Sequence, residues 1–398
     1  MGDGVANGSV IRFQELPQVH FARLFIVAAA NDEVGTPFPP TLMFLSDIDG
    51  PLDRYLTDLA RLAPDGLDSI FAHCEGYPSV RERSDTTRVA YLSACSVKAQ
   101  AIYINTIGRS VRQIRDEARL RDAIVAFLDR PGQDWSSKSP AEIRTVIQGY
   151  VNRDPALAWA CEPAPKPGVP YRFKEALHRI GVPLLLILLL PAIVLGLPAW
   201  LVLLRVHERR DPAPRFKPDA VYVDQLSSLE DHIGQNAFSA VGLVKPGRFR
   251  LLTVRAVLWL VNYGIRHFFN KGQLTGVKTI HFARWVMIDN QRRLAFASNY
   301  DGSLESYMDD FIDKVAWGLN AVFSNGVGYP KTDWLLFRGA RDELAFKGFL
   351  RSHQTPTRVW YSAYPRLTAA NIENNAKIRA GLSGEMDGNT AERWLRRL

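Results

Sequence analysis

Residues 293–330 read RLAFASNYDGSLESYMDDFIDKVAWGLNAVFSNGVGYP, and they repeat an earlier stretch, TLMFLSDIDGPLDRYLTDLARLAPDGLDSIFAHCEGYP at 41–78. The two stretches align without a gap at a constant offset of 252, and 14 of their 38 positions are identical. A shorter match precedes each stretch, because His20-Phe21-Ala22-Arg23 recurs as His281-Phe282-Ala283-Arg284. An ungapped match of this length predicts two fused copies of one folding unit.

The pattern of the second copy predicts the strand and helix order β-α-β-β-α-β of a ferredoxin-like unit. Strands are expected at 237–244, 279–288, 293–300 and 321–327, with helices at 250–269 and 304–319. Each copy then continues with a helix, a strand and a helix, and we expect the late strand 100–105 to join the sheet of the first copy. The predicted fold class is α+β, with two ferredoxin-like repeats that form a pseudo-dimeric α+β barrel.

The predicted domain boundaries follow from these copies and from proline-rich linkers. The first repeat covers 1–160 and the second covers 220–385. Between them, 161–219 contains the linkers and an apolar segment at 182–204, and 386–398 forms a basic tail.

The apolar segment at 182–204 carries no charged residue over 23 positions. An uncharged run longer than about 18 residues is typical of a transmembrane helix. Pro191 and Pro198 interrupt this run, and two copies that pack together must lie on the same side of a membrane. We therefore expect a monotopic insertion, as a bent hairpin or re-entrant segment in the cytoplasmic leaflet. The alternative is a kinked single span with the copies on opposite faces.

The charge distribution indicates which kinds of partner the protein can bind, and the cysteine content indicates the cellular compartment. The net charge is +8, but the basic residues form no long stripe with interleaved aromatic residues, so we expect no nucleic acid partner. Three cysteines without a CxxC pair, and an N-terminus without a secretory signal, favour the cytoplasmic side of a bilayer. A cluster of basic residues flanks the apolar segment and suits anionic lipid headgroups: Arg172, Lys174, Arg179, Arg205, Arg209, Arg210, Arg215 and Lys217.

Common catalytic motifs such as HExxH, GxSxG and the phosphate loop are absent from the sequence. Each copy does carry an arginine on the apolar face of a strand, Arg23 in the first copy and Arg284 in the second. Such an arginine needs a partner if it is buried, because an unpaired buried charge is costly. The aspartate of the repeated Asp-Gly, Asp49 or Asp301, is the nearest candidate. The pair could belong to a pocket, or it could be a helix cap with a structural ion pair.

His353 is the other candidate site residue, because it closes a helix of the second copy just before Thr355-Pro356. A histidine in this position could bind a haem iron axially. It could also interact as a cation with the carbonyl groups at the helix C-terminus.

Two ferredoxin-like units with facing sheets resemble the dimeric α+β barrel superfamily. The Asp-Gly ends of SDIDG at 46–50 and SNYDG at 298–302 are similar to the GxxDG segment of dye-decolourising peroxidases, although Ser46 and Ser298 replace its first glycine. The resemblance implies that Asp301 is a proton shuttle, that Arg284 is the distal cation and that His353 is the ligand of a haem iron. The string IHFARW…SNYDGSLESYMDDF…GYP resembles a group of uncharacterised bacterial membrane-associated proteins, which implies no activity.

Two functions are therefore expected. The first is a membrane-associated oxidoreductase of peroxidase type that uses haem on a lipophilic substrate held between the two sheets. The second is a non-catalytic module that binds lipid or a partner at the membrane surface.

Overall fold

The computed structural model describes residues 10–33, 35–132, 134–162, 168–212, 218–269 and 272–398. Parts of both proline-rich linkers, with the basic residues Arg215 and Lys217, and the first nine residues lie outside these ranges. The fold class is α+β, as the sequence predicts. The chain forms two compact units, a larger one of residues 1–107 and 174–366 and a smaller one of 108–173 and 367–398.

The larger unit contains two main antiparallel sheets, which are both open in the described part of the chain. The four-stranded sheet has the order β5-β7-β8-β6, with β5 at Ala101–Ile104, β7 at Ile280–Ile288, β8 at Arg293–Asp301 and β6 at Gln235–Leu243. The three-stranded sheet has the order β11-β1-β4, with β11 at Val359–Ser362, β1 at Val19–Val27 and β4 at Thr41–Ile48. The predicted barrel is therefore not closed.

Each sheet contains a late strand that follows the aligned stretch of the other sheet in the sequence. Strand β5 follows the first aligned stretch but pairs with β7, and β11 follows the second stretch but pairs with β1. The registers are equivalent, since Tyr103 lies opposite Ala283 and Tyr361 lies opposite Ala22. The expectation that 100–105 joins the sheet of its own copy is wrong, because β7 of the other copy offers the edge that β5 completes.

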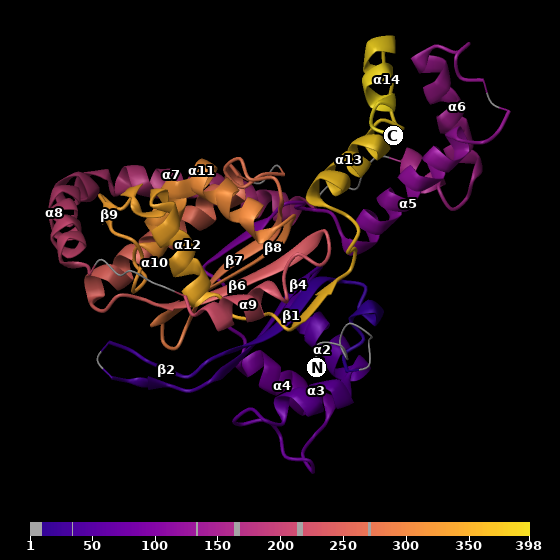
Figure 1. Ribbon diagram of the computed structural model, residues 1–398. Helices are drawn as coiled ribbons and strands as arrows, with labels where there is room; N and C mark the ends of the chain where they lie inside the picture. Colours follow the sequence, from indigo (N-terminus) through magenta and orange to yellow (C-terminus); the bar gives the residue numbers. More distant parts are fainter. Residues whose placement is uncertain (1–9, 34, 133, 163–167, 213–217, 270–271) are drawn as a thin grey trace. The chain divides into compact units, whose positions relative to one another are not determined.

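Helices cover the outer face of each sheet (Figure 1). The four-stranded sheet packs against α10 (Arg248–His267), α11 (Leu304–Phe323) and α12 (Glu343–His353), and the three-stranded sheet against α2 (Leu52–Leu62), α3 (Pro64–Phe71) and α4 (Asp85–Ala94). Helix α11 takes up the first three residues, 321–323, of the apolar run expected as a strand at 321–327, and within the rest of that run only Gly326 forms an isolated bridge, to Val244. The order β-α-β-β-α-β is therefore incomplete at its last strand.

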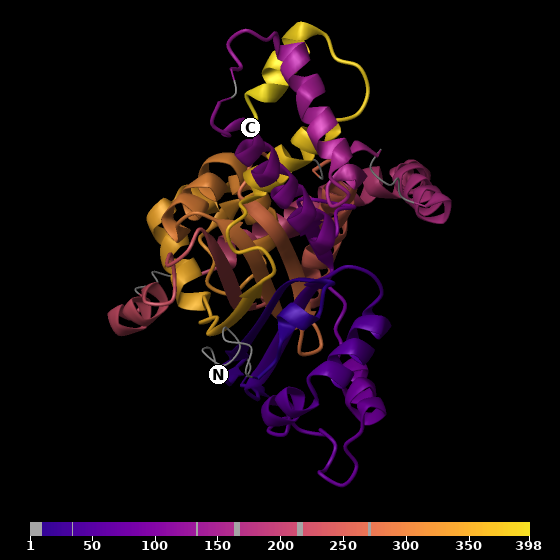
Figure 2. The same ribbon diagram turned by 90° about the vertical axis from the view of Figure 1, so that its right-hand side faces the viewer.

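The smaller unit is helical in its described part, and Figure 2 shows its four main helices together. They are α5 (Val111–Leu128), α6 (Pro140–Arg153), α13 (Ala369–Ala380) and α14 (Gly388–Leu395). Trp394 of α14 is buried and donates its indole N–H to the carbonyl oxygen of Ile378 at 2.9 Å. The predicted basic tail 386–398 is thus largely a packed helix, and the division into units crosses the predicted boundaries because α5 and α6 pack with the C-terminal helices.

The apolar segment forms the end of α7 (Val169–Leu188) and most of α8 (Leu190–Arg210). The helical hydrogen bonds continue across the junction, from Leu189 N to Leu185 O and from Ile193 N to Leu189 O, both at 2.9 Å. Pro191 lies in the first turn of α8, where a helix needs no backbone donor. In the part of the chain that the structure describes, α8 is the one helix long and apolar enough to cross a membrane, and it is mostly exposed.

The remaining elements are short. They are α9 (Ala220–Ser227), the 3-10 helices Phe13–Glu15, Ala158–Cys161 and Gly339–Arg341, and two small hairpins, β2 (Ala30–Asn31) with β3 (Pro37–Phe38) and β9 (Thr332–Asp333) with β10 (Phe337–Arg338).

Candidate functional site

Two arginines join the two sheets, and the first of them, Arg23 of β1, is buried. Its Nη1 donates to the Phe238 carbonyl oxygen at 2.7 Å and to Ser239 Oγ at 3.1 Å. Its Nη2 donates to the Ser298 carbonyl oxygen at 2.8 Å and to Asn299 Oδ1. Burial lowers the pKa of Arg23 to about 10, so the guanidinium remains charged at neutral pH.

The second arginine, Arg284 of β7, makes the equivalent contacts in the opposite direction. Its Nη2 donates to the Ser46 carbonyl oxygen at 3.1 Å and forms an ion pair with Asp47. Asn299 Nδ2 donates to Asp47 Oδ2 at 3.0 Å, so the aligned residues Asp47 and Asn299 also contact each other. Each copy therefore holds the arginine of the other copy through the same two positions.

Two aligned histidines lie next to this network and repeat the symmetry. His20 Nε2 donates to Asp49 Oδ1 at 3.0 Å, and His281 Nε2 donates to Asp301 Oδ1 at 2.7 Å. The His20 ring has an additional partner, since Nδ1 lies 2.8 Å from the Tyr364 hydroxyl. Both histidines are buried, which fits the packing role of strand residues that repeat in both copies.

The predicted pairing of arginine with the aspartate of Asp-Gly is therefore wrong. Asp301 pairs with His281, and Arg284 pairs with Asp47, two positions before the Asp-Gly of the first copy. The reason is that the arginines cross the interface between the sheets, which places them beside the other copy rather than beside the end of their own neighbouring strand. Their donors are directed at protein acceptors, and this indicates a structural role.

His353 lies at the end of α12 beside an apolar cavity of about 50 Å³. Its Nδ1 is 2.8 Å from the Phe349 carbonyl oxygen, and its ring packs on the Phe349 ring with centroids 4.1 Å apart. On the other side it faces Gly242 so closely that a Cβ there would lie 3.1 Å from His353 Cδ2. Burial lowers the pKa of His353, which favours the neutral ring.

These surroundings do not fit a haem at His353. Pockets for ligands of this size commonly have volumes of about 300–1,000 Å³. The cavity beside His353 has about 50 Å³, and the ring is enclosed by Phe349 and the backbone of β6. The three predicted site residues also have different hydrogen-bond partners, which are Asp47 for Arg284, His281 for Asp301 and the Phe349 carbonyl for His353. Their predicted catalytic roles remain predictions.

Aromatic rings occupy the region between the sheets where a lipophilic ligand was expected. Phe21 lies 5.7 Å from Phe282, 6.0 Å from Trp360 and 5.4 Å from Tyr364 between ring centroids. An apolar hollow of about 290 Å³ lies elsewhere, over the three-stranded sheet, and is lined in part by Leu24, Leu42 and Val359.

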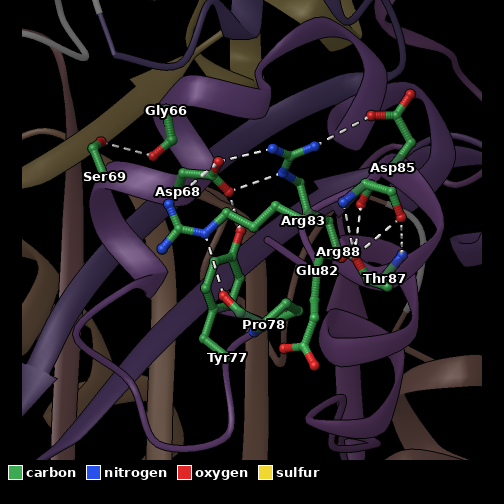
Figure 3. Close-up of polar contacts among 11 residues, drawn as sticks. Gly66, Asp68, Ser69, Tyr77, Pro78, Glu82, Arg83, Asp85, Thr87 and Arg88 are labelled. Carbon is green, nitrogen blue, oxygen red and sulfur yellow. Dashed lines mark hydrogen bonds and ion pairs between the residues drawn. The ribbon is translucent and has the colours of Figure 1, made fainter. Parts of the chain in front are cut away.

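A second polar cluster links α3 to α4 in the first copy (Figure 3). Asp68 accepts from Arg88 Nε at 2.9 Å and Nη2 at 2.7 Å, and from the Tyr77 hydroxyl at 2.7 Å. These hydrogen bonds, with that of Arg88 the largest cause, lower the pKa of Asp68 to about 2. At the aligned positions of the second copy, the Tyr329 hydroxyl donates to Asn320 Oδ1 at 2.9 Å, but the carboxylate is replaced by an amide.

Helix α10 holds the middle of α7 through its last turn. Arg266 forms an ion pair with Glu175 and donates from Nε to Oε2 at 2.9 Å. His178 Nδ1 lies 2.7 Å from His267 Nε2, a distance that requires one ring nitrogen to donate and the other to accept. Burial lowers the pKa of both histidines, with Arg266 and Glu175 as the charged neighbours common to both.

The first turns of α10, with the residues that precede them, hold the end of α8. Trp200 donates its indole N–H to Thr253 Oγ1 at 3.3 Å, and the His207 ring stacks on Phe249 with centroids 4.8 Å apart. Asp211, directly after α8, accepts from Lys245 and Arg250, both at 2.7 Å. Both ends of the apolar segment are therefore bound to one helix.

The residues between these two attachments are exposed and apolar. Leu188 is 77% exposed and Leu195 is 81% exposed, and most of the large side chains from 184 to 203 are exposed as well. The sequence signals this surface through its uncharged run. It does not signal the attachments, because Glu175, His178 and His207 look like ordinary flanking polar residues until the partner helix is known.

No known family model matches the chain, and no similar curated protein or solved structure is found.

Proposed function

We propose that this protein is a monotopic, non-catalytic lipid-binding module that attaches to a membrane surface through α7 and α8. The observation that carries the proposal is that both ends of the exposed apolar segment are bound to α10. Helix α10 in turn packs on the four-stranded sheet through Val254, Leu258 and Ile265, which are all buried.

The geometry favours insertion from one side over a complete crossing. A hydrocarbon core is about 30 Å thick, so a crossing segment emerges with its ends on opposite sides. Here the two ends of the apolar segment are attached to the first turns and to the last turn of α10, which belongs to the folded core. These two places on α10 are roughly 25 Å apart at 1.5 Å per residue. A crossing would draw the sheets and their buried polar network into lipid, whereas an inserted α7–α8 surface leaves them in water.

The duplicated core fits a rigid support for this surface. We infer that two ferredoxin-like repeats have exchanged their late strands, and three aligned side-chain contacts support this inference. They are His20–Asp49 with His281–Asp301, Ser46–Tyr55 with Ser298–Tyr307 at 2.7 and 2.6 Å, and Asp68–Tyr77 with Asn320–Tyr329.

The test is sedimentation of the detergent-purified protein with phosphatidylcholine vesicles, with and without phosphatidylserine. We expect binding in both cases and stronger binding to the anionic vesicles, because each basic residue near the surface contributes about 1 kcal/mol. Leu188→Asp with Leu195→Asp should reduce binding more than about 100-fold, since each charge costs about 2.5–3.5 kcal/mol inside a bilayer. Val80→Asp is the matched control, because Val80 is 76% exposed in the loop before α4. Unchanged binding of the double variant would contradict the proposal.

Oxidoreductase activity of peroxidase type is the other function that the sequence predicts. It requires a redox cofactor, because these side chains alone do no redox chemistry. The enclosed His353 ring gives it no support, so we place it second.

A further inference from the structure

The hairpin of β9 and β10 exposes large apolar side chains although it belongs to the folded larger unit. We call residues 332 to 338, which comprise β9, β10 and the turn between them, the 332–338 hairpin. Trp334 is 47% exposed, Leu336 is 40% exposed and Phe337 is 56% exposed. Three exposed apolar residues within four positions form a local patch rather than a single scattered side chain.

Three residues of this hairpin have strained backbone φ angles. Trp334, Leu335 and Arg338 have φ values of 55°, 67° and 60°, in the left-handed region that favours glycine. Such a residue persists only when its surroundings hold it in this conformation. The strain therefore points to contacts that fix the hairpin.

One of these contacts comes from α8 itself. Glu208, near the end of α8, has a fully buried side chain. Its Oε1 accepts from Leu335 N at 2.7 Å and from Thr332 Oγ1 at 3.0 Å, and its Oε2 accepts from Trp334 N at 2.9 Å. Arg205, one turn earlier, lies over the Trp334 ring at 5.7 Å. The end of the apolar helix thus holds the hairpin directly.

The second contact comes from α11. Asn320 is fully buried, and its Nδ2 donates to the carbonyl oxygens of Leu336 and Arg338, both at 2.9 Å. Its Oδ1 accepts from Ala340 N at 2.8 Å, and the close approach needs Gly339, where a Cβ would lie 2.1 Å from that oxygen. The hairpin is therefore held on both sides by satisfied buried groups.

The two copies differ at this point. The position of Asn320 is taken in the first copy by Asp68, which binds the arginines of its own copy instead of a loop (Figure 3). An amide can donate to carbonyl oxygens and a carboxylate cannot. The exchange of carboxylate for amide is therefore what lets the second copy hold the 332–338 hairpin.

We propose that the 332–338 hairpin is a second membrane-contacting element, which inserts Trp334 and Phe337 at the lipid headgroup level beside α8. This inference rests on the proposed function. Tryptophan is enriched at the membrane–water interface, where an amphipathic ring is stable. The hairpin is bound to the last turns of α8, which follow its exposed apolar stretch. Arg205 and Arg338 lie beside it and both pair with Asp333, and the well exposed Arg338 side chain is placed to reach an anionic headgroup.

The experiment uses an environment-sensitive fluorophore at single cysteines in the full chain with Cys74, Cys95 and Cys161 replaced by serine. Leu195→Cys reports on the proposed function, and Phe337→Cys reports on the hairpin. Val80→Cys is the control, since Val80 is exposed and its loop before α4 lies away from α7 and α8 in Figure 1. Each label is measured with phosphatidylcholine–phosphatidylserine vesicles that carry a lipid-borne quencher.

We expect a blue shift and quenching at 195 and 337 and neither at 80. A response at 195 without one at 337 would overturn the hairpin inference and leave the proposed function in place. No response at 195 would overturn both. A blue shift at 337 that is not quenched by the lipid would also overturn the inference, since it would show a protein partner or a second copy of this chain. As an independent measurement, Trp334→Ala with Phe337→Ala should weaken vesicle binding ~10-fold. Trp334 is 47% exposed and Phe337 is 56% exposed, so together they offer the lipid about as much surface as one full apolar side chain. Unchanged binding would contradict the inference.

Discussion

Replacing Asp47 by alanine should destabilise the larger unit strongly, because it leaves a charge without its partner between the two sheets. Asp47 is 7% exposed, and it accepts from both Arg284 and Asn299. Removing one partner of a buried ion pair costs about 3–5 kcal/mol. The Arg284 side chain retains 17% exposure, so water can solvate part of it and we expect the lower end, about 3 kcal/mol.

The assay is thermal unfolding in detergent, followed by tryptophan fluorescence. A change of 1 kcal/mol shifts the midpoint by roughly 2 °C in a unit of this size, so Asp47→Ala should lower it by about 6 °C. Glu15→Ala is the control, because Glu15 pairs with Arg12 at 3.2 Å while both side chains are well exposed. An exposed pair of this kind contributes about 0–1 kcal/mol.

A double variant separates the loss of a pair from a general loss of packing. Arg284→Met added to Asp47→Ala removes the uncompensated charge. The double variant should therefore lose less stability than the sum of the losses in the two single variants. Equal midpoints for Asp47→Ala and Glu15→Ala would refute the reasoning, and so would strict additivity in the double variant.

Three further predictions concern pH, haem and topology. The pKa values of His178 and His267 are lower in the folded protein than the value of 6.5 of a free histidine. As the pH falls below 6.5, the unfolded state therefore binds protons before the folded state does, which favours unfolding. The attachment of α7 to α10 should be complete above pH 6.5 and should weaken below it. Limited proteolysis of α7 should increase there, and His178→Gln should flatten the pH dependence; a pH-independent wild type would contradict this. Protein expressed with ample haem should show no Soret band, and a band that disappears in His353→Ala would restore the peroxidase interpretation. Accessibility labelling in cells should modify Cys95 and a cysteine placed by Ser352→Cys from the cytoplasmic side, whereas labelling from opposite sides would contradict one-sided insertion.

Much of the local structure could be predicted from the sequence alone. The strands β7 and β8 and the helix α10 lie within one or two residues of their expected bounds. These elements are long and strongly patterned, and their apolar periodicity determines their type. The expectation of a strand at 321–327 is wrong because this apolar run is short, and a short apolar run fits a helix end and a strand equally well.

The candidate site could be predicted only in part. The repeated arginines, aspartates and histidines were recognisable as a set, but their partners were not. Asp47 and Asn299 differ between the aligned stretches, and this difference is the signal that could have identified them. Glu208 offered only a weaker signal, as a carboxylate near the end of an apolar run.

The sequence by itself determined that two 38-residue stretches match without a gap, that the fold class is α+β and that an apolar segment lies between the stretches, since periodicity, composition and self-similarity are properties of the chain order. Only the tertiary structure decided that β5 and β11 change sheets, that each arginine binds the opposite copy, and that α10 holds both ends of the apolar segment. These choices depend on contacts between residues that are far apart in the chain. Sheet edges, buried charges and helix faces can each find several partners of suitable chemistry, and packing of the whole unit selects among them.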